Sequence, residues 1–324
     1  MKPLVSIIIP TYNCRHYINE CLNSLVTQQY QNFQAIIIDD CSTDGTAELL
    51  DGRLLDKRFG YHRQESNSGA SIARNKGVEM AEGEYIVLLD ADDLLLPSHL
   101  STTVELLDKM PDIGLVCCDS RLIGPEGEIL HNGQTWHEVQ CVIKNRTLRT
   151  GPRSLSDIFQ FSLCFTGFTV RRDVYQELGG LDQSIFPLDD YDFMLRLAGR
   201  GIGVFYLNEV HALRRDHATN WSGPRYAVKV AQKKLECLEH ALMANPTLHV
   251  DKDVWHSRFG EAYEELAISH YYQRQYLPAL IATARATVYD SERLSHMARL
   301  LWRKARRRLR YMEQANQPNH ANVD

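Results

Sequence analysis

The runs VSIII at residues 5–9 and AIII at residues 35–38 decide the fold class of this 324-residue chain. Both runs are short, rich in β-branched residues and continuously apolar, which is typical of strands buried on both faces of a parallel sheet. Between them, apolar residues recur at helical spacing at Ile18, Cys21, Leu22, Leu25 and Val26. The order strand, helix, strand predicts an α/β layered domain.

The alternation continues along the next 170 residues. The pattern predicts helices from Thr46, over 70–81, over 98–110 and over 189–198, and strands over 59–62, 85–89, 113–118 and 203–207. The polar stretch 124–153 carries mixed signals, for which we expect antiparallel strands and loops. The resulting fold class is a Rossmann-like, mostly parallel sheet flanked by helices.

The character of the sequence changes at Tyr226. Apolar residues beyond that point fall at helical steps, so we expect an all-helical C-terminal appendage over 226–312. Residues 313–324 are polar and predict a disordered tail. The expected organisation is therefore one α/β domain over 1–225, a helical domain over 226–312 and a tail.

Charge is divided unequally between these parts. The formal net charge is −5, but residues 1–225 carry 21 basic and 30 acidic side chains, and residues 226–324 carry 15 and 11. An acidic balance argues against a dedicated nucleic-acid binder. In the tail, residues 299–310 (RLLWRKARRRLR) hold seven cations and no acid. This segment indicates either a basic helix on anionic lipid, for which we delimit 293–312, or an ordinary solvated helix face.

Cysteine spacing and targeting signals point to the cytosol. The eight cysteines show no C-x-x-C or zinc-type spacing, and the apolar run at residues 5–9 stops at Pro10, far short of a signal-peptide core. We expect reduced thiols and a cytoplasmic protein, peripheral on the inner face of a membrane if the basic segment binds lipid. Phosphate-loop and dinucleotide fingerprints are missing, as are hydrolase, zinc-protease and kinase motifs.

Acidic residues follow three of the predicted strands. The strand ends read Pro10-Thr11-Tyr12-Asn13, Asp39-Asp40-Cys41-Ser42 and Asp90-Ala91-Asp92-Asp93. In open α/β sheets, ligands bind beyond the C-terminal ends of the strands. A single terminal Asp is as often a turn former or helix cap, but a pair such as Asp90 and Asp92 can hold a hard divalent cation. An anionic ligand at an acidic edge needs such a cation, or one such as Arg74.

Five blocks of sequence resemble, in order, the family 2 glycosyltransferases. They are VSIIIPTYN (5–13), AIIIDDCSTDGT (35–46), NSGASIARNKG (67–77), EGEYIVLLDADD (82–93) and GGLDQSIFPLDDYDFMLR (179–196), and the match covers about residues 3–220. The resemblance implies a GT-A fold and an enzyme that transfers a hexosyl or N-acetylhexosaminyl group from a nucleotide diphosphate donor, expected to be a UDP-sugar. It also implies inversion at the anomeric carbon and a Mn²⁺ or Mg²⁺ cofactor.

Carried over residue by residue, the resemblance assigns the donor site. Pro10, Thr11, Tyr12 and Asn13 would line the base and ribose, with Asp40 facing the nucleobase and Asp39 beside it. Arg74 would reach toward the base or phosphates. Asp90-Ala91-Asp92 matches the family's D-x-D motif, in which the first acid holds the ribose and the second the metal, and Asp93 is a close neighbour.

The block Leu188-Asp189-Asp190-Tyr191-Asp192 resembles the family's acidic base motif. Asp190 occupies the position of the catalytic base, which must accept the proton of the acceptor hydroxyl. Asp189 and Asp192 remain alternatives, as does a purely structural role in capping the helix that follows. Arg214, Arg215 and His217 resemble a late basic segment that approaches the diphosphate, and His217 could be a further metal ligand or part of a surface loop.

These features predict an inverting, metal-dependent glycosyltransferase in polysaccharide or surface-glycan synthesis, acting on a glycan or lipid-linked acceptor. The Q-x-x-R-W motif of the family's processive synthases is missing, so we expect transfer of single sugars. The alternative is a catalytically degenerate domain that binds nucleotide sugars as a scaffold or sensor. The sugar, acceptor and linkage depend on loops within 124–167.

Overall fold

The computed structural model describes residues 3–50, 56–139, 148–160, 166–218, 220, 223–244 and 252–289. The basic segment 299–310 and the tail 313–324 lie outside this range. By packing, the chain forms two compact units, Met1–Gly223 with Glu236–Val250, and Pro224–Leu235 with Asp251–Asp324. The expected domain boundary at residue 225 stays a prediction, because a single helix contributes to both units.

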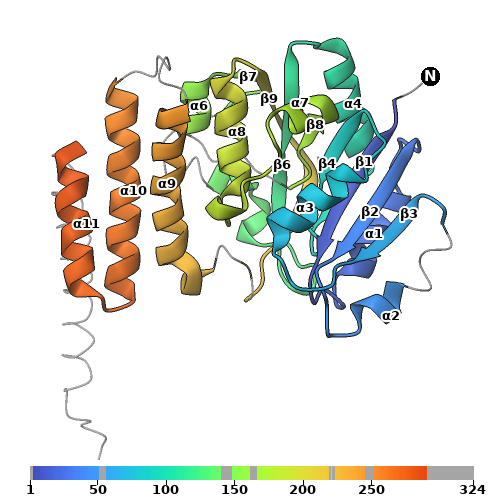
Figure 1. Cartoon of the computed structure of the whole chain (residues 1–324), viewed down its shortest axis with the longest axis horizontal. Coiled ribbons are helices and arrows are strands. Elements are labelled where there is room, and N and C mark those ends of the chain that lie inside the picture. Colours follow the sequence, from blue (N-terminus) through green and yellow to red (C-terminus); the bar gives the residue numbers. More distant parts are fainter. Residues whose placement is uncertain are drawn as a thin grey trace, which may run out of the picture. The chain divides into compact units, whose positions relative to one another are not determined.

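The first unit is built on one mixed sheet with strand order β3-β2-β1-β4-β8-β6-β9-β5 (Figure 1). Its strands are β1 (Val5–Thr11), β2 (Phe33–Asp39), β3 (Phe59–Arg63), β4 (Tyr85–Leu88), β5 (Leu94–Leu95), β6 (Ile113–Ile123), β7 (Gly151–Arg153), β8 (Thr169–Arg171) and β9 (Gly203–Arg215). Strands β3, β2, β1 and β4 are parallel, as are β6 and β9, whereas β8 joins the two sets antiparallel to both.

Helices cover both faces of this sheet. They are α1 (Ile18–Val26), α2 (Thr46–Leu50), α3 (Ala70–Glu79), α4 (His99–Lys109), α6 (Leu155–Gln160), α7 (Arg172–Glu177) and α8 (Asp189–Gly199). The fully buried side chains Val5, Ile7 and Ile9 of β1 pack in one core with α1 and α4. Ile8, which points the other way, lies against α3. The α/β fold class expected from the apolar runs is confirmed.

Two strands are longer than predicted. The pattern indicated 113–118 and 203–207, but β6 and β9 pair as far as Ile123 and Arg215. Exposed Asn208 and Glu209 interrupt the apolar run of β9, and the register shifts on either side of Asp119 in β6. Such bulges let a strand continue past a break in alternation. The extension of β9 carries Arg214 and Arg215 to the edge of the sheet where the acidic strand ends lie.

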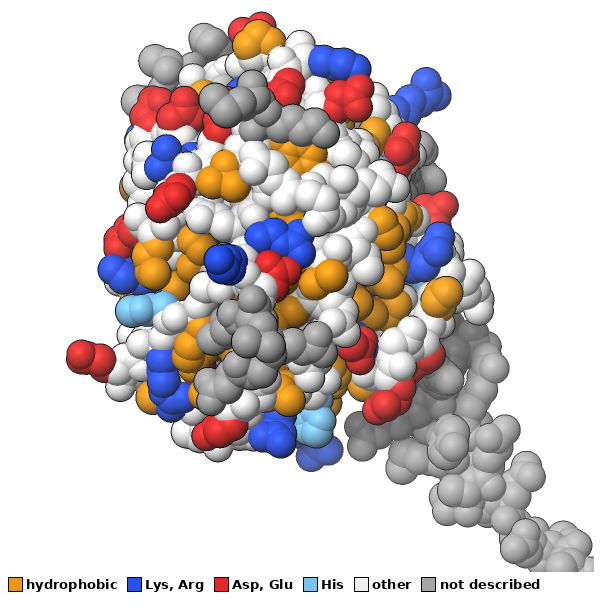
Figure 2. Space-filling view, turned by 90° about the vertical axis from the view of Figure 1, so that its right-hand side faces the viewer, with side chains coloured by type: hydrophobic (Ala, Val, Ile, Leu, Met, Phe, Trp, Pro, Cys, Tyr) orange, Lys and Arg blue, Asp and Glu red, His pale blue; other side chains and the backbone are white. Residues whose placement is uncertain are grey.

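The remaining helices are α9 (Ala227–Ala244), α10 (Lys252–Tyr272) and α11 (Tyr276–Tyr289). They match the helical appendage predicted from the sequence up to residue 289. Among the described residues, no helix has both the length and the apolar character that crossing a lipid bilayer requires. Figure 2 shows one face of the molecule, on which basic and acidic side chains are interspersed among apolar ones.

The contact between α3 and β1 depends on a glycine. A Cβ atom at Gly77 would clash with Cγ2 of Ile8, a β-branched side chain with little freedom to move. We expect Gly77→Ala to lower the free energy of unfolding by about 1–2 kcal/mol, because overpacking outweighs the gain of about 1 kcal/mol in helix propensity. Thermal or urea unfolding measures the difference.

The matched control is Gly60→Ala in β3. A Cβ there has no atom closer than Ala35 O at 4.0 Å, so we expect a change below about 0.5 kcal/mol. If Gly77→Ala unfolds at the same midpoint as Gly60→Ala, close packing of α3 on β1 does not limit the stability of the fold.

Candidate functional site

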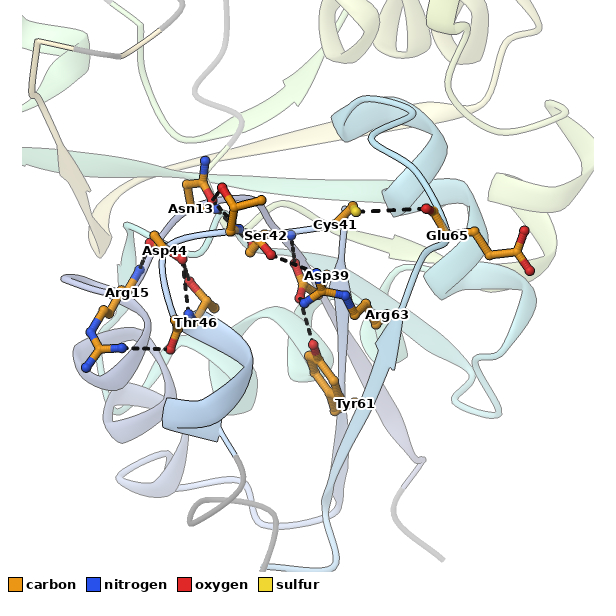
Figure 3. Close-up of polar contacts among 12 residues, drawn as sticks. Asn13, Arg15, Asp39, Cys41, Ser42, Asp44, Thr46, Tyr61, Arg63 and Glu65 are labelled. Carbon is orange, nitrogen blue, oxygen red and sulfur yellow. Dashed lines mark hydrogen bonds and ion pairs between the residues drawn. The ribbon is translucent and has the colours of Figure 1, made fainter.

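The loops after β1 and β2 are tied together by hydrogen bonds (Figure 3). Asn13 N donates to Ser42 Oγ at 2.9 Å, and Thr43 N donates to Asn13 Oδ1 at 2.8 Å. Asn13 has a φ of 53°, a left-handed conformation that asparagine tolerates better than most residues. These bonds hold the loop so that the neighbouring Tyr12 is 48% exposed, whereas Thr11 is buried. Tyr12 is thus the side chain of this loop best placed to contact a ligand.

Asp39 and Asp40 are both buried and have partners within the protein. Asp39 accepts hydrogen bonds from Ser42 N at 2.9 Å and Tyr61 OH at 2.6 Å, and pairs with Arg63 at 3.3 Å (Figure 3). Burial of Tyr61 and the hydrogen bond from its hydroxyl to Asp39 raise the pKa of Tyr61 to about 12. Asp39 therefore fixes the loop after β2.

Asp40 holds the start of α3. Its Oδ1 accepts from Ser68 N at 2.7 Å and Gln64 Nε2 at 2.8 Å, and its Oδ2 accepts from Gly69 N at 2.7 Å. Gly69 has a φ of 95°, which favours glycine. The carboxylate thus satisfies backbone donors just ahead of the helix. Contact of Asp39 and Asp40 with a nucleobase stays a prediction.

Arg74 joins two acidic segments that are far apart in the sequence. Its guanidinium lies 2.6 Å from Asp90 Oδ1 and 3.3 Å from Asp189 Oδ2, and the side chain is 8% exposed. Ser71, one turn earlier on α3, donates to the same Asp189 oxygen at 2.7 Å. Asn75 exchanges two hydrogen bonds of 2.9 Å with the backbone of Leu181. Helix α3 therefore positions both the end of β4 and the start of α8.

Asp90, Asp92 and Asp93 form an acidic cluster after β4. One carboxylate oxygen from each lies within 4.8 Å of the others. Asp93 is buried and accepts from Thr166 Oγ1 and Arg215 N, both at 2.8 Å. Burial and the charges of Asp92 and Asp90 raise the pKa of Asp93 well above its ordinary value. Asp90 and Asp92 are the partly exposed acids of this cluster, and Ala91 between them is buried.

His217 contacts Asp92, which lies 125 positions earlier in the sequence. Its Nε2 lies 2.8 Å from Asp92 Oδ2. The imidazole stacks on the ring of Tyr17, with 5.1 Å between centroids, and the guanidinium of Arg215 lies 4.8 Å from the centroid of the same ring. A carboxylate and an imidazole in contact are donors that Mn²⁺ accepts, and Asp92 also lies beside the carboxylates of Asp90 and Asp93. The residues present therefore fit a divalent cation.

Arg215 and Arg214 have different surroundings, and the approach of either to a diphosphate stays a prediction. Arg215 is 1% exposed, donates to the carbonyl oxygens of Asp92, Gly124 and Pro125, and pairs with Glu20 at 2.7 Å. All of these contacts hold protein groups together. Arg214 instead lies over the ring of Trp136, at 4.4 Å from the centroid. Of the two, Arg214 is the one placed at a ligand-accessible surface.

The three acids of α8 have distinct surroundings. Asp189 is buried against Arg74 and Ser71. Asp192 is fully buried and pairs with Arg196 at 2.7 Å and His240 at 3.2 Å. Asp190 is half-buried, and its Oδ1 accepts the N–H of Tyr191 at 2.6 Å.

The pKa of Asp190 suits a general base near neutral pH. Burial among protein atoms and the charge of Asp189 raise this pKa to about 7, against the opposing effect of the Tyr191 N–H and the Arg74 charge. A carboxylate whose pKa lies near ambient pH can both be ionised and accept a proton efficiently. Of the three alternatives left open by the sequence, Asp190 is the half-buried acid with a pKa near 7, and the choice of base stays a prediction.

The structure thus brings together Arg74, Asp90, Asp92, Asp93, Asp189 and His217 by direct contacts. Tyr17, Glu20, Ser71, Trp136 and Thr166 were missed by the sequence analysis. Tyr17 stacks on His217, and Thr166 bonds Asp93. Ser71 lies in the block 67–77, and the other four lie outside the five quoted blocks, because their roles arise from contacts between residues distant in sequence.

Comparison with known proteins adds independent information. The family model described as glycosyl transferase family 2 matches residues 6–179, which is more than half of the chain. The putative teichuronic acid biosynthesis glycosyltransferase TuaG of Bacillus subtilis is 43% identical over 33% of this chain and 42% of its own length. The hyaluronan synthase of Pasteurella multocida is 30% identical over 76% of this chain and 23% of its own length. The chain thus spans less than half the length of these relatives.

Solved structures share the fold at low sequence identity. Residues 1–349 of Staphylococcus aureus TarS in complex with UDP-GlcNAc align with a TM-score of 0.58 and 18% identity, over 91% of this chain and 92% of that one. The mannosyltransferase PcManGT from Pyrobaculum calidifontis, in complex with GDP-Man and Mn²⁺, aligns with a TM-score of 0.62 and 19% identity, over 97% and 85%.

The raised pKa of Asp190 has a consequence for stability. Between pH 4 and 7 the unfolded chain has lost this proton while the folded protein retains it, so folding stability falls with rising pH and levels off above about pH 7. Asparagine cannot ionise. We therefore expect the melting temperature of Asp190→Asn, relative to the unsubstituted protein, to rise from pH 4 to 7 and then stay constant, in chelator-containing buffer.

Asp173→Asn is the control, because exposed Asp173 makes the same kind of bond to the next backbone N–H, at 2.7 Å, in the first turn of α7. Relative to the unsubstituted protein, the melting temperature of Asp173→Asn should not rise from pH 4 to 7. Parallel pH profiles for the two variants would show that the carboxyl of Asp190 titrates as an ordinary aspartate.

Proposed function

Since the chain belongs to glycosyltransferase family 2, as the match over residues 6–179 shows, we propose that it is an inverting, metal-dependent transferase of single sugars. The donor is a nucleotide diphosphate sugar, and the acceptor is a hydroxyl of a glycan or glycolipid in polysaccharide or surface-glycan synthesis. The observation that carries this proposal is the half-buried Asp190, with a pKa of about 7, anchored beside the acidic cluster through Asp189 and Arg74.

Each part of the site has a task in this reaction. Tyr12 and Asn13 contact the base and ribose, and Asp90 contacts the ribose. Asp92 and His217 hold a Mn²⁺ or Mg²⁺ ion, which supplies positive charge for the diphosphate. Asp93 is a poor ligand by comparison, because its two oxygens already accept from Thr166 and Arg215.

The transfer itself uses Asp190. The acceptor oxygen attacks C1 of the sugar while Asp190 takes the hydroxyl proton, and the bond from C1 to the diphosphate oxygen breaks. The electron pair of that bond leaves with the nucleotide diphosphate. Attack opposite the leaving group inverts the configuration at C1. Arg74 keeps Asp189 in place, and the negative charge of Asp189 helps to maintain the basicity of Asp190.

The base assignment predicts a selective loss of transfer. We expect Asp190→Asn to reduce the rate of nucleotide diphosphate release in the presence of acceptor by about 10²–10⁴-fold, with donor affinity nearly unchanged. In the unsubstituted protein the rate should rise with pH and level off above about pH 7. Asp173→Asn should behave as the unsubstituted protein. Full turnover by Asp190→Asn would show that another residue is the base. Donor binding without turnover in the unsubstituted protein and in both variants would favour a sensor or scaffold.

The metal assignment predicts a selective loss of the cation response. In thermal-shift measurements with UDP-GlcNAc, UDP-glucose and GDP-mannose, a binding donor should raise the melting temperature more with Mn²⁺ than with chelator. We expect Asp92→Ala to remove this difference. The control Asp216→Ala changes an exposed acid one position from His217 and should preserve it. If Asp92→Ala keeps its full Mn²⁺ response, Asp92 is not a ligand.

A further inference from the structure

Helix α11 carries apolar side chains on two opposite faces. Its inner face consists of alanines: Ala279, Ala282 and Ala286 are 8%, 3% and 0% exposed. Its outer face carries larger residues, with Leu277, Leu280, Ile281 and Val288 exposed by 67%, 66%, 50% and 80%. A helix that is apolar on all sides is ordinarily buried.

The outer residues form one continuous stripe. At 3.6 residues per turn, positions 277, 280, 281, 284 and 288 fall on one side of the helix, opposite to the three buried alanines. Position 284 is a further exposed alanine. We define these five residues as the outer stripe of α11. Such a contiguous exposed apolar surface is the mark of an interaction site.

The charges around the outer stripe indicate its partner. The sequence from Tyr272 to Tyr289 has no acidic residue, and it has two cations, Arg274 and Arg285, both exposed. An anionic surface with an apolar interior complements both the stripe and the cations.

Two tyrosines extend the stripe at its beginning. Tyr272 and Tyr276 are 61% and 62% exposed, and each ring lies about 6 Å from that of Tyr271. Tyrosine combines an apolar ring with a polar hydroxyl and favours the boundary between lipid chains and water. A single helical stripe is also small beside the roughly 800 Å² per partner that a stable protein dimer buries.

We propose that the outer stripe of α11 docks on an anionic lipid surface, with Leu277, Leu280, Ile281 and Val288 inserted among the acyl chains and Arg274 and Arg285 at the headgroups. The helix lies in the plane of the interface, as amphipathic helices do, and does not cross the bilayer. This proposal is independent of the reaction assigned above.

The test is flotation of the full chain with vesicles of phosphatidylcholine containing 30% phosphatidylglycerol, and with vesicles of phosphatidylcholine alone. We expect binding to the anionic vesicles, and at least a tenfold loss of partition for Leu280→Glu/Ile281→Glu. The difference between the two proteins should persist at 0.5 M NaCl, where attraction between charges is screened and apolar insertion remains. Phosphatidylcholine alone should bind weakly.

The matched control is Met80→Glu/Met243→Glu, which makes the same change of charge at two isolated exposed apolar residues, 43% and 80% exposed. It should bind vesicles as the unsubstituted protein does. Hydrogen exchange of the unsubstituted chain supplies a readout that does not rely on variants, since anionic vesicles should slow exchange within 272–289.

Three outcomes would overturn the proposal. One is equal vesicle binding by the stripe variant and the control, and another is unchanged exchange within 272–289 when the unsubstituted chain is bound. The third is a protein that ignores vesicles but forms oligomers which Leu280→Glu/Ile281→Glu dissociates in light scattering, because the partner would then be a second copy of the chain.

Discussion

The site depends on one buried guanidinium, that of Arg74, held between Asp90 and Asp189. Burying a cation is costly unless it is paired, and of the two carboxylates Asp189 is also held by the hydroxyl of Ser71. Arg74 therefore links the end of β4 to the start of α8, segments separated by about a hundred residues. Asn75, the next residue on α3, binds the backbone of Leu181 ahead of α8. A single helix thus holds the acidic cluster after β4 and the start of α8 in fixed relation to each other.

The acids of the site are alike in sequence but not in surroundings. Asp39, Asp40 and Asp192 have their oxygens occupied by protein donors and maintain loops or helices. Asp92 and Asp190 are half-buried and keep one side open to ligands. A carboxylate that already accepts two or three hydrogen bonds has little to offer a substrate. Burial and pairing, rather than residue type, separate the acids that maintain loops and helices from Asp92 and Asp190, the acids proposed to act in the reaction.

The sequence alone predicted the fold class and the acidic strand ends, whereas the role that it assigned to Asp190 stays a prediction. These features are encoded locally, in apolar runs such as VSIII and in motifs a few residues long. The continuation of β9 to Arg215 was not predicted, because Asn208 and Glu209 break the apolar pattern and only pairing with β6 restores it. The stacking of Tyr17 on His217 and the buried role of Arg215 could not be predicted either, since both arise from contacts across about 200 residues.

The ion pairs of Arg74 and Arg215 decide how an anionic donor could bind at the acidic edge of the sheet. The cations Arg74 and Arg215 look suited to a diphosphate in the sequence, yet both are buried and already matched by carboxylates, Arg74 by Asp90 and Asp189, and Arg215 by Glu20. Neither can neutralise a ligand without leaving an acid unpaired, which is costly in a buried setting. Under the proposed reaction, the charge of the diphosphate would therefore be balanced by Arg214 or by a cation held at Asp92, whose carboxylate contacts His217. The proposed divalent ion is thus consistent with the pairing of Arg74 and Arg215 inside the protein.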